Sequence, residues 1–151
     1  MIKEDKERLV GICRKVENSC MGTRVRRAAR VVGNYYDVHL KSAGLKGTQF
    51  TLLNAIFLNP SITITQLADL LLLNRTTLNR NLKPLERQGL VRTSPGKDQR
   101  TRVLKLTQEG SSLLQSALPL WLEAQTGVVE TLGARTQRLT EDLTRLEKLE
   151  T

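Results

Sequence analysis

The sequence predicts a mainly α-helical fold with one small β-hairpin, and three features carry this prediction. Apolar residues recur at helical spacing through most of the 151 residues. Two short strand-like stretches, 90–93 and 102–106, flank a segment in which Pro95 and Gly96 favour a turn. Hydrophobic residues make up 39% of the chain but aromatic residues only 3%, so Leu, Val and Ala must form the core of one compact subunit.

Three helices are expected before residue 60. The first covers about 4–17, the second about 20–42 with Gly44 marking its exit, and the third ends near Asn59-Pro60 with Thr48 as its N-cap. The apolar stripe of the second helix consists of Met21, Val25, Ala28, Ala29, Val32 and Tyr36. A short β-branched stretch, Ile62-Thr63-Ile64, could add a third strand to the hairpin.

Two further helices are separated by a tight turn. The first covers about 65–73, and Asn74 is a suitable N-cap for the second, which runs from about Arg75 to Gln88 and stops at Gly89. This second helix points leucines inward and basic and hydroxyl residues outward. Pro84 lies inside it, removes one backbone donor and predicts a local bend. Two helices across a short turn, with a polar and basic tip on the second, fit insertion into a DNA major groove.

The loop of the hairpin carries a candidate arginine for the minor groove. Asp98 and Arg100 are two residues apart, so in extended backbone they point the same way. The carboxylate can then orient the guanidinium through charge-assisted hydrogen bonds. A projecting arginine suits the negative potential of a minor groove.

Positive charge concentrates where this reading places the DNA. Residues 65–106 hold nine Lys/Arg and three Asp/Glu, whereas residues 107–151 hold four and seven. A merely soluble basic protein would not require this separation.

Three segments resemble the MarR family of winged helix-turn-helix transcription regulators. They are Asn74 to Val91 (NRTTLNRNLKPLERQGLV), Asp98-x-Arg100 and Leu106-Thr107-x-x-Gly110. The resemblance covers 44–110 strongly and the flanking helices loosely. It implies a homodimer that binds pseudo-palindromic double-stranded operator DNA, usually as a repressor released by a small molecule or an oxidant. It also implies that the helix after Asn74 is the recognition helix and that Arg100 lies at the tip of the wing.

The expected organisation is a winged helix-turn-helix flanked by dimerisation helices at both ends. Residues 1–44 form the N-terminal dimerisation helices, 45–110 the DNA-binding domain and 107–151 the C-terminal dimerisation helices. Thr107 is the expected N-cap of a long helix that Pro119 should bend, and Gly133 allows a turn into a last amphipathic helix. Its apolar stripe needs a partner, either a second subunit or, alternatively, an intramolecular three-helix packing.

The predicted DNA contacts fall into two groups, although each charged residue could also be an ordinary solvated one. Base edges and phosphates are assigned to Arg75, Thr76, Thr77, Asn79 and Arg80. The sugar-phosphate backbone is assigned to Lys83, Arg92, Lys97, Arg102 and Lys105, with Asp98 bracing Arg100.

The sequence leaves two kinds of regulatory signal possible, a small-molecule effector and the oxidation of a cysteine. The family resemblance implies an effector crevice, for which the candidates are Tyr35, Tyr36, His39 and Trp121, or these are simply core or interface aromatics. Cys20 is a candidate redox switch, with Arg24 near enough to favour a thiolate, but its spacing to the tyrosines fits the peroxide-sensing branch poorly and a plain thiol is the alternative.

Other classes of function lack sequence support. Two cysteines and one histidine give no disulfide scaffold and no metal-ligand cluster, and no glycine-rich phosphate loop or nucleophile–base pair is present. We therefore expect no catalysis, no metal and no cofactor. The charged start and the lack of a long apolar run predict a cytoplasmic protein that does not enter the membrane. A winged-helix module that binds protein partners is the remaining alternative.

Overall fold

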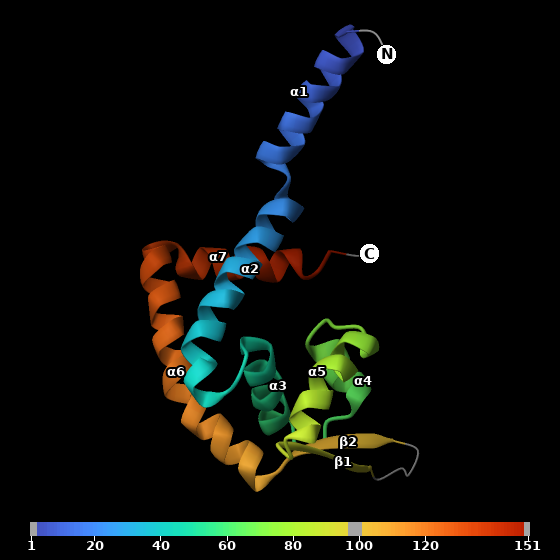
Figure 1. The fold of residues 1–151 in the computed structure, drawn as a ribbon, viewed down its shortest axis with the longest axis vertical. Helices are drawn as coiled ribbons and strands as arrows, with labels where there is room; N and C mark the ends of the chain where they lie inside the picture. The colour runs from blue at the N-terminus through green and yellow to red at the C-terminus, as the bar shows by residue number, and fades with distance from the viewer. Residues whose placement is uncertain (1–2, 97–100, 150–151) are drawn as a thin grey trace. The chain divides into compact units, whose positions relative to one another are not determined.

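The computed structural model describes residues 3–96 and 101–149, and contacts divide the chain into two compact units, Met1–Tyr35 and Tyr36–Thr151. The first unit holds α1 (Lys3–Ser19) and most of α2 (Met21–Leu40). The second unit continues with α3 (Gly47–Leu58), α4 (Ile64–Leu70), α5 (Arg75–Arg87), β1 (Val91–Pro95), β2 (Arg102–Leu106), α6 (Gln108–Leu132) and α7 (Thr136–Leu146) (Figure 1). The prediction of a mainly helical chain with one antiparallel hairpin is confirmed for the described residues.

The hydrophobic core lies in the second unit, between α3, α4, α5, the hairpin and the first half of α6. Its fully buried large side chains are Leu40, Leu52, Leu53, Ile56, Leu67, Leu78, Leu85 and Leu104. Burying one such leucine stabilises the fold by about 1.5–3 kcal/mol. The core therefore fixes α5 on a rigid support, which is what a reading helix requires.

The start of α3 differs from the prediction that Thr48 caps it. Helix α3 begins two residues earlier than that, at Gly47, and Lys46 occupies the N-cap position. The Asp37 carboxylate accepts a hydrogen bond from the Gly47 N–H at 2.7 Å, and Gln49 Oε1 accepts from the Lys46 N–H at 2.9 Å. Asp37 from α2 and Gln49 from the first turn of α3 thus satisfy these donors, so no capping residue is needed at Thr48.

The segment 62–64 is not the third strand that its composition predicts. Thr63 caps α4 instead, with Thr63 Oγ1 accepting from the Gln66 N–H at 3.1 Å and Gln66 Oε1 accepting from the Thr63 N–H at 2.9 Å. Reciprocal capping of this kind competes with strand pairing. The segment pairs with the hairpin only through an isolated bridge between Thr63 and Val103 among the described residues. Beside this bridge, the Leu104 N–H donates to the Ile62 carbonyl.

Helices α4 and α5 of the helix-turn-helix end in turns of the same type. After α4, the N–H groups of Leu72 and Leu73 bond back to the carbonyls of Asp69 and Ala68. After α5, those of Gly89 and Leu90 bond back to Glu86 and Leu85 in the same pattern. Both are Schellman ends, whose extra residue needs a positive φ. It is +71° at Gly89, as predicted, but +51° at Leu72, which is not a glycine.

The predicted bounds of these elements need small changes. Helix α4 ends at Leu70 rather than at residue 73, because the Schellman turn has already begun. The strand β1 starts at Val91 rather than Leu90, because the Leu90 N–H is still bonded to the end of α5. Helix α5 does continue through Pro84, and the bend expected there stays a prediction.

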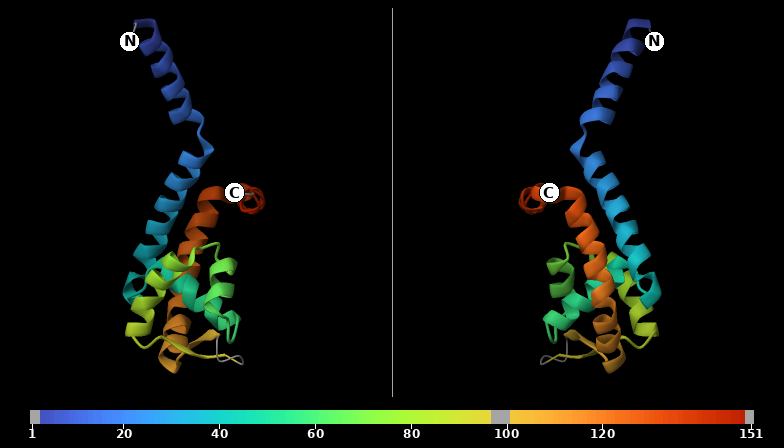
Figure 2. Two further views of the ribbon diagram at one scale, coloured as in Figure 1. Left: turned by 90° about the vertical axis from the view of Figure 1, so that its right-hand side faces the viewer. Right: turned by 90° about the vertical axis from the view of Figure 1, so that its left-hand side faces the viewer.

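The hairpin extends along one edge of the second unit, next to α4 and α5 (Figures 1 and 2). Its register pairs Val91 with Leu106 and Pro95 with Arg102. Thr107 then caps α6, as predicted, by accepting from the Gly110 N–H at 3.0 Å. Helix α6 runs through Pro119 and curves in Figure 1. Within the described part of the chain, no helix combines the length and apolarity needed to cross a membrane.

Candidate nucleic-acid interface

Helix α5 separates a buried apolar face from an exposed polar one. Leu78, Leu82 and Leu85 are at most 2% exposed, as the sequence predicted. The residues assigned to base edges and phosphates lie on the other side. Of these, Arg75, Thr76, Asn79 and Arg80 are exposed and Thr77 is half-buried. Lys83, which is assigned to the sugar-phosphate backbone, is exposed on the same side. Most of the predicted reading residues are therefore available to a ligand on one helix face.

The N-terminal tip of α5 is held by side chains on both sides of the turn. Asn74 Oδ1 accepts from the Thr77 N–H at 2.8 Å, which confirms the predicted N-cap. The Arg75 guanidinium donates to Thr65 Oγ1 on α4 at 2.7 Å. The first bond satisfies a free backbone donor, and the second ties the tip to the preceding helix. The reading end of α5 is thus fixed before any partner binds.

The hairpin places two positive charges directly opposite each other. The register pairs Arg92 on β1 with Lys105 on β2, and both side chains are exposed. Directly opposed residues of an antiparallel pair share one face of the sheet, where like charges are destabilising. A polyanion removes this repulsion. Each positive charge could be read from the sequence, but the hairpin register that pairs Arg92 with Lys105 could not.

Part of the predicted wing lies outside the described residues. Lys97, Asp98 and Arg100 fall in residues 97–100, outside the described residues. The brace between Asp98 and Arg100 therefore stays a prediction. Arg102, just after this segment, is exposed at the start of β2.

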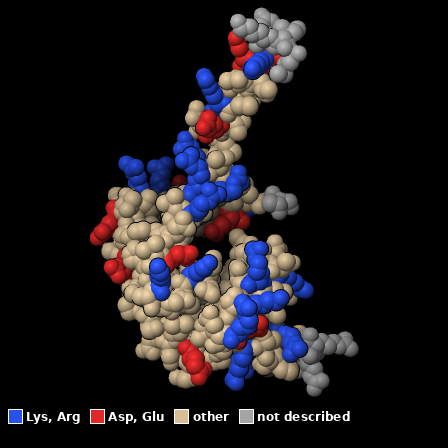
Figure 3. Space-filling model, viewed as in Figure 1, with Lys and Arg blue, Asp and Glu red and all other residues tan. Residues whose placement is uncertain are grey.

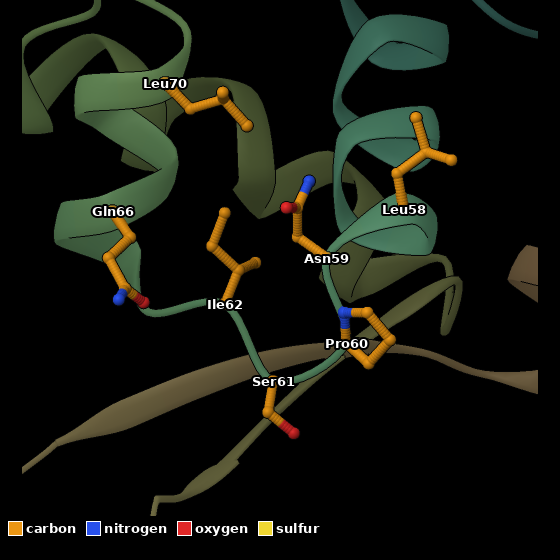
Figure 4. Close-up of a pocket in the computed structure, with 7 residues that line it drawn as sticks. All are labelled: Leu58, Asn59, Pro60, Ser61, Ile62, Gln66 and Leu70. Atoms are coloured by element: carbon orange, nitrogen blue, oxygen red, sulfur yellow. The ribbon is translucent and has the colours of Figure 1, made fainter.

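Basic side chains gather over α5 and the hairpin on the face shown in Figure 3. A neighbouring hollow has a different character. It has a volume of about 550 Å³ and lies between the end of α3, the following loop and α4 (Figure 4). Its lining is uncharged: Leu58, Asn59, Pro60, Ser61, Ile62, Gln66 and Leu70. The basic surface therefore does not extend into this hollow.

Two of the four effector candidates meet at the junction of α2 and α6. The rings of Tyr36 and Trp121 lie 6.4 Å apart, and Trp121 also stacks on Phe50 at 6.0 Å. The Tyr36 hydroxyl donates to Gln125 Oε1 on α6. Tyr35, by contrast, belongs to the first unit and is 40% exposed. His39 is half-buried near the end of α2.

Cys20 lies at the junction between α1 and α2. Hydrogen bonds from the Thr23 hydroxyl and backbone N–H lower the pKa of the Cys20 thiol, and the positive charge of Arg26 contributes to the same effect. Arg24 does not have the role expected for it, since its guanidinium donates to the Asn18 carbonyl at 2.7 Å. Cys20 is half-exposed and, among the described residues, is not part of a disulfide. The local chemistry therefore favours a thiolate.

Apolar side chains at the two ends of the chain remain exposed. They are Leu9, Ile12, Val16, Met21, Val25 and Val32 in the first unit and Leu122, Leu139, Leu143 and Leu146 in α6 and α7. Exposed apolar faces of this kind are typical of protein–protein contact surfaces.

Comparison with known proteins agrees with the fold and with the basic face. The model of the MarR family matches residues 43–101. Comparison with curated proteins gives no significant match. Among solved structures, the M. tuberculosis transcriptional regulator MosR in complex with DNA is 40% identical, with 85% of this chain and 93% of that chain covered and a TM-score of 0.78.

Two further structures extend the comparison. A second crystal structure of M. tuberculosis MosR is 37% identical to this chain, with 86% of this chain and 94% of that chain covered and a TM-score of 0.77. A mutant of E. coli MarR complexed with operator DNA is 21% identical, with 89% and 97% covered and a TM-score of 0.78, and shows the shared fold. The identity to MosR extends over nearly the whole chain, so this protein belongs to the MarR family of winged helix-turn-helix, DNA-binding transcription regulators.

Proposed function

We propose that this protein is a homodimeric repressor that binds pseudo-palindromic operators and is released by a small-molecule effector. The main support for DNA binding in this proposal is the exposed Arg92–Lys105 pair beside the polar face of α5. Like charges held opposite each other favour an anionic partner. The relative MosR, 40% identical, was crystallised in complex with DNA, which supports the same use of this surface.

The two parts of the basic surface have different tasks in this proposal. Thr76, Asn79 and Arg80 on α5 read base edges in the major groove, where an Arg–guanine pair discriminates by about 1–3 kcal/mol. Arg92 and Lys105 on the hairpin contact phosphates, which positions the protein without reading sequence. Affinity should consequently fall steeply with salt, whereas sequence preference should depend on α5.

Dimerisation would explain the exposed apolar residues at both ends of the chain. The stripe of α7 presents Leu139, Leu143 and Leu146, each 40% exposed, at helical spacing. A second copy can cover such a stripe, and a two-fold dimer then presents two copies of α5 to successive half-sites about one duplex turn apart. This geometry accounts for the proposed two-fold symmetry of the operator.

Selection of genomic fragments on the purified protein tests DNA binding. Bound fragments should share a two-fold motif, and Arg80→Ala should strongly reduce the preference for it over random DNA in a fluorescence anisotropy titration. Arg138→Ala on α7, also an exposed arginine, is the matched control and should bind normally. If the folded protein prefers no sequence at moderate salt, the DNA proposal fails and a module that binds proteins becomes the better reading.

Sedimentation velocity tests the dimer. Leu143→Asp places a charge in the α7 stripe and should shift the protein towards monomer. The control Leu58→Asp changes a leucine that is 66% exposed in the winged-helix region and should leave the dimer intact. A wild-type monomer at micromolar concentration would rule out the proposed assembly.

The effector proposal rests on the contact of Tyr36 with α6. A ligand inserted beside Tyr36 and Trp121 would change how α6 is held, and would shift the population between DNA-competent and incompetent dimers. Trp121 is the single tryptophan of the chain, so its fluorescence reports on this site directly. A ligand that releases the operator without changing Trp121 emission would place the effector site elsewhere.

A thiol signal is the second candidate, favoured by the lowered pKa of Cys20. A thiolate reacts with peroxide to form a sulfenic acid and releases water or hydroxide. Such a polar change at the α1–α2 junction would disturb the N-terminal helices. Mild peroxide should then weaken operator binding by the wild type, with the oxygen found at Cys20 by mass spectrometry. If Cys20→Ser responds in the same way, Cys20 is not the sensor.

A further inference from the structure

One side chain joins the recognition helix, the wing and the long helix α6. The Thr107 hydroxyl donates to the Gly89 carbonyl at 2.7 Å and lies 3.2 Å from the Leu90 carbonyl. The Thr107 N–H donates to the same Leu90 carbonyl at 3.1 Å. The hydroxyl also accepts from the Gly110 N–H at 3.0 Å, which caps α6. Thr107 therefore bonds at once to the exit of α5, the entry to β1 and the first turn of α6.

Gly110 lets the first turn of α6 approach the backbone of Leu90, between α5 and β1, more closely than any other residue would permit. A Cβ at this position would lie 2.0 Å from the Leu90 carbonyl oxygen and 2.9 Å from the Leu90 carbonyl carbon. Ordinary contact begins at 3.4 Å, so even alanine would require a displacement of about 1.4 Å. The neighbouring atoms are backbone atoms, which cannot turn aside as a flexible side chain can. The segments themselves would have to separate.

We call the contact of Thr107 and Gly110 with Gly89 and Leu90 the joint. The joint lies at the C-terminal end of α5, whereas the DNA-reading tip near Arg75 is at the N-terminal end. Helix α5 has 13 residues and is therefore about 20 Å long. A tilt of about 10° at its C-terminal end would move the tip near Arg75 by about 3.5 Å, close to the spacing of one base pair. Small changes at the joint are consequently large at the DNA.

We propose that Thr107 and Gly110 are positioning residues that fix the angle between the recognition helix and α6, and thereby the spacing of the two reading helices in the dimer. The inference rests on the proposed dimeric operator binding. It predicts that the joint controls the match to a two-fold operator and leaves each α5 able to read its own half-site. Neither residue contacts DNA in this scheme.

The experiment measures binding to three kinds of DNA duplex: a half-site, the full operator, and operators with one or two base pairs inserted or removed between the half-sites. The variants are Gly110→Ala, Thr107→Val, which removes the hydroxyl, and Thr107→Ser, which keeps it. Two matched controls leave the joint intact. Gly33→Ala adds a methyl group where nothing lies within 4 Å, and Thr51→Val removes a hydroxyl that donates to the Gly47 carbonyl within α3.

Gly110→Ala should lose about tenfold or more in affinity for the full operator, because the two half-sites are no longer engaged together without strain. Half-site affinity should stay within about twofold, and the preferred operator spacing should change. Thr107→Val should show a smaller loss of the same kind, and Thr107→Ser and both controls should match the wild type.

Two results would overturn the inference. One is a folded Gly110→Ala protein whose full-site affinity and spacing preference equal those of the wild type. The other is an equal loss on half-site and full site, which would mean general damage to the reading domain. If Gly110→Ala does not fold, by circular dichroism, the contrast between Thr107→Val and Thr107→Ser decides alone. Failure of the proposed function would be visible separately, as wild-type protein that does not bind DNA or does not dimerise.

Discussion

The turn that leads into the recognition helix contains a leucine where its backbone geometry favours glycine. Leu72 has a φ of +51°, in the left-handed region, and its side chain is 69% exposed. An L-residue in this conformation costs about 1–2 kcal/mol. Glycine avoids that cost but loses about 0.5–1 kcal/mol of extra backbone entropy on folding. Leu72→Gly should therefore be more stable than Leu72→Ala by about 0.5–1 kcal/mol.

Comparison of the Gly and Ala variants at one position cancels the loss of the leucine side chain, which both share. Leu70 provides the matched control, because it is 54% exposed and is the last residue of α4, in regular helix. There the order should reverse, with Leu70→Gly less stable than Leu70→Ala by up to about 1 kcal/mol. Urea titrations at one protein concentration measure all four variants. When the free energy of unfolding falls with urea concentration at the usual rate for a small protein, each of these stability differences shifts the urea concentration at the unfolding midpoint by about 0.3–1 M.

The reversal of sign is the decisive result. If Ala is as stable as Gly at both positions, or if Gly is worse at both, the turn after α4 does not hold position 72 in a strained conformation. The reasoning about the Schellman end would then be wrong. Operator affinity should also be measured, because the side chain at 72 lies three residues before the reading tip.

Three further outcomes are expected. Arg80→Ala should cost about 1–3 kcal/mol of operator affinity at each half-site and little affinity for random DNA, as measured by competition anisotropy; an equal loss on both would contradict base reading. Lys105→Ala should remove two phosphate contacts per dimer and reduce the slope of log affinity against log salt by about 2, and an unchanged slope would contradict the phosphate assignment. Because its pKa is lowered, Cys20 in the folded protein should react with iodoacetamide at lower pH than in the urea-unfolded chain, as followed by mass spectrometry; coincident pH profiles would contradict this.

Much of the fold could be predicted because local signals agree with the tertiary structure. Asn74 caps α5, Thr107 caps α6 and Gly89 has the positive φ expected of a helix end. In each case a short polar side chain or a glycine does what its own chemistry favours. The leucines of α5 are buried as their spacing predicts. The family resemblance was also needed, since helix propensity alone would have ended α5 before Pro84.

The failures occur where another side chain, from a different helix or from the same segment, changes the structure that the residue itself favours. Thr48 is a good capping residue, but the Asp37 carboxylate from α2 already satisfies the start of α3. The stretch 62–64 has strand composition, but Gln66 completes a capping box with Thr63. The candidate site has the same limit. Single positive charges could be assigned from the sequence, but the opposition of Arg92 and Lys105 depends on the register of the hairpin.

The Arg92–Lys105 pair also affects how the protein behaves without DNA. Repulsion between these charges makes the free hairpin less stable than its side chains would otherwise allow. Multivalent anions such as phosphate or sulfate relieve this repulsion better than chloride at equal ionic strength. The buffer chosen for storage or crystallisation therefore sets part of the stability of the unbound protein, and phosphate in a binding assay competes for the same surface as the operator.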